Sequence, residues 1–194
     1  MQELNRFIIS HPSEQKLPRA YFKPKIHKQY PPLKFRPIIS QLNTYNAPLS
    51  KFVAKILSPL VGTFSDAHLK NSQDFTTRLY TFYRNNPHYL SYPLLSLDIE
   101  NLFTNVPLEP TLQFLERKLT DRDDLDLPEG ITVATLMDLI RLCSKSTVFS
   151  FNDSFYQQKE GVAMGSPLAC ILANLFMEHY ETELRSSLPL QPAL

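Results

Sequence analysis

The stretch Ser96-Leu97-Asp98-Ile99-Glu100-Asn101-Leu102-Phe103-Thr104-Asn105-Val106-Pro107 decides how this chain is interpreted. It continues an apolar run, residues 92–97, whose composition predicts a buried β-strand that ends at Asp98. A carboxylate at the end of a buried strand is costly unless a cation meets it, and the usual candidates are a metal ion or an arginine. The identity of that cation separates an enzyme of phosphate chemistry from an ordinary α/β domain.

Length and composition indicate one domain with a real core. The chain has 194 residues, of which 43% are hydrophobic. No apolar run is as long as a membrane span, and the first residues lack the pattern of a secretory signal, so we expect no membrane partner. Cys143 and Cys170 fall in helix-like patterns and are interpreted as reduced core residues, which predicts a nuclear or cytoplasmic location.

The net charge of +1 conceals an asymmetry along the chain. Residues 1–36 hold eight basic and two acidic side chains and so carry +6, whereas the remaining residues carry −5. A basic segment on a nearly neutral chain favours contact with phosphates, although a solvated N-terminal arm would have the same composition.

Hydrophobic spacing predicts a mostly helical chain with a few short strands. A strand is expected over residues 33–40, and a hairpin is expected to turn at Asn152-Asp153. The helical periods cover residues 49–60, 72–83, 108–119, 132–143 and 166–183.

A glycine-rich segment, Gly161-Val162-Ala163-Met164-Gly165-Ser166-Pro167, precedes the last helical period. Gly165 allows close approach of a ligand to the backbone, while Ser166 and Pro167 are suited to a helix N-terminus, which favours anions. A capped connection between a hairpin and a helix would explain the same residues without a ligand.

A basic aromatic segment, Tyr21-Phe22-Lys23-Pro24-Lys25-Ile26-His27-Lys28, is followed by Phe35-Arg36-Pro37-Ile38. An arginine fixed between an aromatic residue and a proline on a short strand could hold a triphosphate, with lysines adding charge. The alternative is a surface strand whose cations bind nothing specific.

Four motifs in this order resemble those of a reverse transcriptase domain of the Penelope-like retroelement type, over residues 17–183. They are Pro24-Lys25-Ile26-His27-Lys28, Arg36-Pro37-Ile38-Ile39-Ser40, Leu97-Asp98 with Leu102-Phe103-Thr104-Asn105-Val106-Pro107, and Gly161 to Pro167 with Asn174-Leu175-Phe176-Met177-Glu178. The resemblance implies an α+β fold, a partial polymerase fingers-and-palm in which a small antiparallel sheet packs with helices. It implies a basic fingers segment at 1–45, incomplete fingers and palm at 46–185, and a tail at 186–194.

The resemblance also implies RNA-directed DNA polymerisation by two-Mg²⁺ nucleotidyl transfer, with Mn²⁺ as a substitute ion. The partners would be an RNA template, a DNA primer and deoxynucleoside triphosphates. Asp98 matches the first catalytic aspartate, which binds the metal ions, and the backbone carbonyl of Ile99 would complete one coordination sphere. Phe103 matches the steric gate, whose ring excludes the 2′-hydroxyl of a ribonucleotide.

The remaining roles concern the incoming nucleotide. Arg36 matches the residue of the fingers that grips the triphosphate, with Lys25 or Lys28 nearby. Gly165 falls in the loop that lies against the nascent base pair, and Met164 takes the place of the glutamine common in other reverse transcriptases.

The sequence departs from this family at its second carboxylate motif, aromatic-x-Asp-Asp, which has no counterpart here. The pair Asp123-Asp124 precedes the glycine-rich segment, and together with Glu100 and Asp126 it is interpreted as solvated surface charge. Asp98 alone cannot hold two Mg²⁺ ions about 4 Å apart. We therefore expect a fragment that does not polymerise DNA by itself, unless a further polypeptide segment supplies the missing palm.

Two alternatives to an inactive polymerase fragment remain open at this point. The first is a non-catalytic remnant that retains affinity for nucleic acid through its basic fingers. The second is an α/β domain that matches the motifs by accident.

Overall fold

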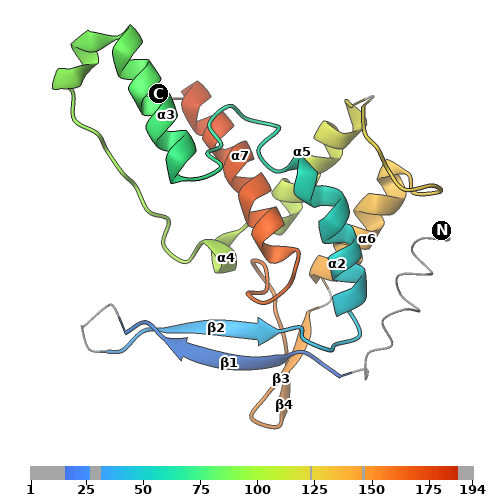
Figure 1. Cartoon of the computed structure of the whole chain (residues 1–194). Helices are drawn as coiled ribbons and strands as arrows, with labels where there is room; N and C mark the ends of the chain where they lie inside the picture. Colours follow the sequence, from blue (N-terminus) through green and yellow to red (C-terminus); the bar gives the residue numbers. More distant parts are fainter. Residues whose placement is uncertain (1–15, 27–31, 123, 146, 188–194) are drawn as a thin grey trace.

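The computed structural model describes residues 16–26, 32–122, 124–145 and 147–187. A group of helices lies against one side of a small sheet, and the hairpin formed by the third and fourth strands projects away from the helices (Figure 1).

The core lies among α2 (Ala47–Leu57), α5 (Leu108–Thr120), α6 (Val133–Lys145) and α7 (Ala169–Ser187). A short 3-10 helix, η1 (Ser58–Leu60), extends α2. These elements confirm the helices that the hydrophobic periods predict. Several leucines of the core are entirely shielded from solvent: Leu57, Leu112, Leu115, Leu136 and Leu175.

The last helix begins three residues later than its period predicts. Ser166 and Pro167 lie in a turn, in which the backbone N–H of Ala169 donates to the carbonyl of Ser166 at 3.1 Å. The Ser166 hydroxyl accepts from the N–H of Leu168 at 3.3 Å, so it closes this turn and does not cap a helix that starts at Pro167.

The sheet has the strand order β2-β1-β3-β4. Its strands are β1 (Arg19–Pro24), β2 (Phe35–Ser40), β3 (Val148–Phe151) and β4 (Ser154–Gln157). The pairs β1–β2 and β3–β4 are antiparallel, whereas β1 and β3 are parallel, with Arg19 opposite Ser150. The expected α+β class is confirmed, and the parallel pair makes the sheet mixed.

The predicted hairpin turn is also present between β3 and β4. Asn152 and Asp153 have φ values of 49° and 59°, the left-handed conformation that the common two-residue hairpin turn requires and that Asn and Asp tolerate.

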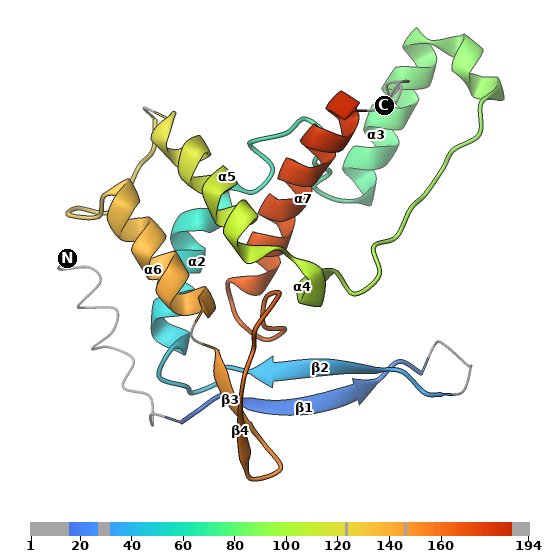
Figure 2. The ribbon, with the colours of Figure 1, turned by 180° about the vertical axis from the view of Figure 1, so that it is seen from behind.

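Residues 61–105, which we call the outer arm, contain no buried residue. The arm holds α3 (Ser72–Asn85), the 3-10 helix η2 (Pro87–Ser91) and the short α4 (Leu102–Asn105). After α3 the chain arches around the outside of the molecule and returns to the other elements at α4 (Figure 2). Phe64 near one end of the arm, and Leu102 and Phe103 near the other, are partly buried and pack against the core.

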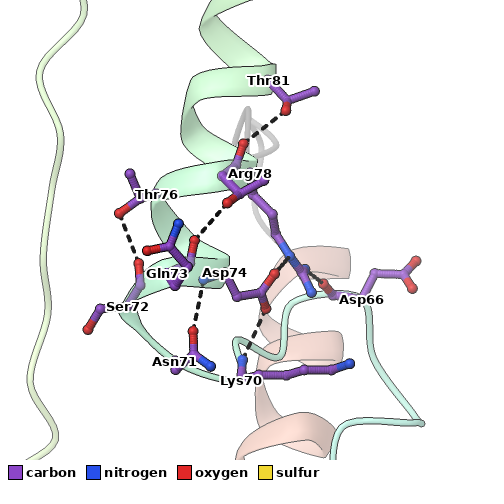
Figure 3. Close-up of polar contacts among 10 residues, drawn as sticks. Asp66, Lys70, Asn71, Ser72, Gln73, Asp74, Thr76, Arg78 and Thr81 are labelled. Carbon is purple, nitrogen blue, oxygen red and sulfur yellow. Dashed lines mark hydrogen bonds and ion pairs between the residues drawn. The ribbon is translucent and has the colours of Figure 1, made fainter.

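Polar contacts hold the first turn of α3 (Figure 3). The Asn71 side chain accepts from the backbone N–H of Asp74 at 2.9 Å and so caps the helix. Asp74 accepts from the N–H of Lys70 and from Arg78, and these two donors keep the pKa of its carboxyl below the usual value. Arg78 also donates to the carbonyl of Asp66 at 2.8 Å.

The predicted buried strand that ends at Asp98 is wrong. Residues 92–99 form no strand, and the side chains of Leu94, Leu95 and Leu97 are 66%, 84% and 82% exposed. The composition of the segment suits a strand, but none of the four described strands pairs with it. A strand needs a neighbour to satisfy its backbone groups and cover its apolar side chains, so this segment stays extended and exposed.

One cysteine differs from its predicted environment. Cys143 is buried, and burial raises the pKa of its thiol to about 11. Cys170 is exposed on the first turn of α7, so its interpretation as a core residue is wrong, although both cysteines are free thiols. Among the described helices, none is both long enough and apolar enough to cross a membrane.

Candidate functional site

One open pocket of about 450 Å³ collects most of the residues to which the sequence assigns a role. It lies where the β1–β2 hairpin faces the end of the outer arm and the glycine-rich segment. Lys28 lies outside the described residues, and Gly165 follows the lining residue Met164 directly in the chain. The assigned residues that line the pocket are Lys25, Arg36, Asp98, Ile99, Phe103 and Met164.

The basic wall of the pocket comes from the β1–β2 hairpin. Arg36 lies on β2 opposite Lys23 of β1, and two flanking residues of β2, Phe35 and Pro37, also line the pocket. Arg36 is exposed, and within the described residues no carboxylate pairs with its guanidinium. This wall therefore presents an unneutralised cation to the pocket.

A turn after Asp98 forms the facing wall. Asn101 has φ 55°, the left-handed conformation that Asn tolerates better than most residues, and it leads into α4 with Phe103 on its first turn. Lys25 Nζ donates to Asn101 Oδ1 at 3.2 Å, and Lys34 Nζ lies 3.4 Å from Glu100 Oε1. Both contacts are exposed and individually weak, but together they join the hairpin to this turn.

The glycine-rich segment bonds to both walls. At one end, the N–H of Val162 donates to the carbonyl of Phe103 at 2.7 Å. At the other, the N–H of Ile39 on β2 donates to the carbonyl of Met164 at 2.7 Å. The segment therefore holds α4 and β2 at a fixed separation, with Met164 between them at the pocket.

The two glycines of this segment are required because a neighbouring part of the backbone lies too close to each of them to leave room for a side chain. Gly161 and Gly165 have φ values of 71° and 117°. A side chain at Gly165 would collide with the carbonyl oxygen of Ile39, and one at Gly161 would collide with the carbonyl oxygen of Phe103. Met164 of this segment lines the pocket of about 450 Å³, whereas Ser166 and Ala169 line a different, very small pocket beside Cys143.

Asp98 is exposed on the acidic side of the pocket, and Ile99 lies beside it. Within the described ranges no three His, Cys, Asp or Glu side chains come together as a metal site would require. The pocket thus opposes two cations, Lys25 and Arg36, to Asp98 and Glu100. Among the described residues Asp98 has no ion-pair partner, whereas Glu100 is paired with Lys34. Such an arrangement suits a ligand that carries phosphates and a shared metal ion.

Sequence reasoning missed two contributors to this site. Asn101 and Lys34 connect the two walls of the pocket. The sequence feature that could have pointed to this connection was the asparagine in the turn that follows Asp98. It also missed a second pocket of about 570 Å³ between α4, the start of α5 and the end of β4. There Lys145 Nζ lies 2.7 Å from Glu109 Oε2, and this hydrogen bond keeps the pKa of the Glu109 carboxyl below its usual value.

A comparison with protein families supports the resemblance described above. A family model described as reverse transcriptase (RNA-dependent DNA polymerase) matches residues 23–191, which include every residue of both pockets. A comparison with curated proteins finds no match.

Proposed function

Because the chain belongs to the reverse transcriptase family, we propose that the pocket between β2 and the turn after Asp98 binds the incoming deoxynucleoside triphosphate of an RNA-directed DNA polymerase. The observation that carries this proposal is that Lys25, Arg36, Asp98 and Phe103, which are far apart in sequence, line one cavity. The family implies nucleic-acid substrates, and an RNA template with a DNA primer is the proposed pair.

Arg36 is the proposed grip on the triphosphate. Its guanidinium has no carboxylate partner among the described residues, and its planar donors match two phosphate oxygens at once. Lys25 adds a second positive charge, and its contact with Asn101 holds it at the pocket.

Phe103 is the proposed steric gate at the sugar. Its backbone carbonyl is fixed by the N–H of Val162, so the ring sits on an anchored helix turn, where it can exclude a 2′-hydroxyl. Met164 and Gly165 would then lie against the nascent base pair, because the glycine-rich segment spans the gap between Phe103 and β2. Methionine at this position is part of the reason to propose the Penelope-like type within the family.

Reverse transcriptases generally use divalent metal ions, and the donors present suit one such ion. The Asp98 carboxylate and the Ile99 backbone lie side by side at the pocket, and Mg²⁺ is commonly held by one or two carboxylates together with substrate phosphates. A bound ion would supply charge neutralisation at the triphosphate. Two ions do not fit the described residues, because Glu100 is paired with Lys34 and no acidic cluster exists among them.

The nucleotide site is tested by titrating dTTP in the presence of Mg²⁺ and measuring its Kd by calorimetry. Arg36→Ala should weaken binding by about tenfold or more, because a charge-assisted bidentate contact is lost. Arg36→Lys should recover part of the loss. Arg117→Ala, at an exposed position on α5, is the matched control and should leave the Kd unchanged. Equal affinities in all four proteins would contradict the proposal.

We further propose that residues 1–194 do not extend a primer by themselves, because Asp98, the one aspartate among the described residues that line the pocket, cannot organise two metal ions. Loss of a catalytic carboxylate lowers the rate by several factors of ten. Each factor of ten corresponds to about 1.4 kcal/mol of activation free energy. Primer extension on a poly(rA) template with Mg²⁺ or Mn²⁺ should give no product. A template-dependent product that disappears in Asp98→Ala would overturn this part of the proposal.

The second candidate function is nucleic-acid binding without catalysis. The observation that favours it is the combination of exposed cations on β1 and β2 with an exposed Asp98 segment that pairs with none of the described strands. The division into fingers at 1–45, palm at 46–185 and a tail at 186–194 remains part of the proposal. So does a further polypeptide segment that would complete the palm.

A further inference from the structure

The helix that carries Phe103 is too short to be stable by itself. α4 has four residues, Leu102–Asn105, and the hydrogen bonds within so short a helix do not offset the cost of ordering its backbone. Asn101 precedes it with φ 55° and ψ 42°, and its side chain provides no cap, since its Oδ1 accepts from Lys25. Other side chains must therefore hold the turn that places Phe103.

Three donors converge on one backbone carbonyl of this turn, that of Asn101. The backbone N–H of Thr104 donates to it at 3.1 Å, and the Thr104 hydroxyl donates to it at 2.9 Å. The third donor is the side chain of Asn105, whose Nδ2 lies 3.0 Å from the same oxygen and 3.5 Å from the carbonyl oxygen of Glu100. The Asn105 amide therefore reaches back over the two residues at which the chain turns from Asp98 and Ile99 toward Phe103.

The chain on the other side of Phe103 is held independently of this turn. The carbonyl of Phe103 accepts from the N–H of Val162 at 2.7 Å, and Val106, directly after Asn105, is 1% exposed. These contacts fix the end of α4 against the core. The position of Ile99 relative to Phe103 is left to the turn, and so to the hydrogen bonds of Thr104 and Asn105.

Asn105 lies behind the wall of the proposed nucleotide site. Its side chain belongs to the lining of the second pocket, of about 570 Å³, whereas Phe103 lines the pocket of about 450 Å³ and Thr104 lines both. A nucleotide in the pocket of about 450 Å³ would meet Phe103, and Asn105 can influence it only through the turn.

We propose that Asn105 is a positioning residue that sets the separation between the Phe103 ring and the Asp98–Ile99 segment, and with it the discrimination against a 2′-hydroxyl. Steric exclusion of one hydroxyl depends on the placement of the ring, and displacements of about 1 Å at a bound substrate are enough to change its reaction or binding strongly. This inference rests on the proposed function, in which Phe103 is the steric gate.

The test compares dUTP with UTP, which differ only in the 2′-hydroxyl, by calorimetry in the presence of Mg²⁺. The wild type should bind dUTP about tenfold or more tightly than UTP. Asn105→Ala should reduce this ratio by about threefold or more, because the side-chain hydrogen bonds that fix the turn are lost. A purely structural role of Asn105 would weaken both nucleotides by the same factor and leave the ratio unchanged.

Two variants serve as matched controls. Asn105→Gln keeps an amide donor and should recover part of the ratio. Asn85→Ala removes an exposed asparagine at the C-terminal end of α3, outside the described lining of both pockets, and should keep the full ratio. Phe103→Ala should abolish the discrimination, and in that background Asn105→Ala should have no further effect on the ratio, because Asn105 acts through the ring.

A second measurement needs no nucleotide. The N–H of Thr104 donates to the carbonyl on which Asn105 also acts, so its amide exchange, followed by nuclear magnetic resonance, should be faster in Asn105→Ala and unchanged in Asn85→Ala. Equal exchange of Thr104 in the wild type and Asn105→Ala would overturn the positioning role whatever the nucleotides do.

The outcomes separate this inference from the function on which it rests. A wild type that discriminates, together with the same ratio in Asn105→Ala, overturns the role of Asn105 and leaves Phe103 as the gate. A wild type that binds neither nucleotide, or binds both equally, overturns the proposed function and the role of Asn105 with it.

Discussion

The helical core and the outer arm both contain apolar residues, but these residues are buried in the core and exposed in the arm. In the core, Leu112 and Leu115 of α5 are completely buried, whereas Leu95 and Leu97 in the arm are more than 80% exposed. Both regions contain dense apolar runs. The difference is that α5 packs against α6 and α7, while the run before Asp98 has no described strand beside it.

This contrast divides the candidate site in two. Arg36, Met164 and Gly165 belong to β2 and the glycine-rich segment, which are bonded to each other, so the half proposed to grip the nucleotide is held by the fold. Asp98 belongs to the arm and is connected to the hairpin through exposed lysine contacts at Asn101 and Glu100. The half proposed to bind a metal ion is therefore the weakly supported part of the site.

The largest expected effect compares two leucines. Leu115→Ala should lower the free energy of unfolding by about 3–5 kcal/mol, because it removes fully buried methyl groups and leaves a cavity. Leu97→Ala should change it by less than about 0.5 kcal/mol, because its side chain is already in solvent. Urea denaturation followed by circular dichroism measures both. A loss in Leu97→Ala comparable to that in Leu115→Ala would mean that the arm is buried in solution.

A smaller effect is expected at the first turn of α3. Asn71→Ala removes the side-chain cap and should destabilise this helix by about 1 kcal/mol. Because α3 contains no buried residue, the loss should appear as faster amide exchange within α3, while protection in α5 and α7 stays unchanged. Thr120→Ala, at the exposed C-terminal end of α5, is the control and should leave α3 exchange as it is. Faster exchange throughout the chain would show that the arm and the core unfold together.

The helices and the β3–β4 hairpin could be predicted from sequence because their signals are local. The spacing of Leu112, Leu115 and Leu119 identifies the buried face of α5, and Asn152-Asp153 identifies the turn. The strand before Asp98 was predicted wrongly because strand formation depends on a neighbour, and no local pattern reports whether one is present. The parallel pairing of β1 with β3 joins residues more than a hundred positions apart and has no local signal.

The candidate site could be predicted in part, because motifs that occur in the order of a known family are expected to come together in the fold as they do in that family. The resemblance named residues on three separated segments, and the structure brings Arg36, Asp98 and Phe103 to one pocket. The contact that joins the walls, Lys25 to Asn101, was not predicted, because it depends on how the hairpin meets the turn.

The most direct test of the account is whether Asp98 binds a metal ion together with nucleotide at this pocket. Electron paramagnetic resonance of Mn²⁺ with dTTP and the protein measures that affinity, and Asp98→Asn should weaken it by about tenfold or more, because a charged ligand becomes neutral. Asp126→Asn, an exposed acid outside the pocket, should leave it unchanged. Equal Mn²⁺–dTTP affinity in the wild type and Asp98→Asn would contradict the assignment of Asp98 as the metal-binding carboxylate of a nucleotide site.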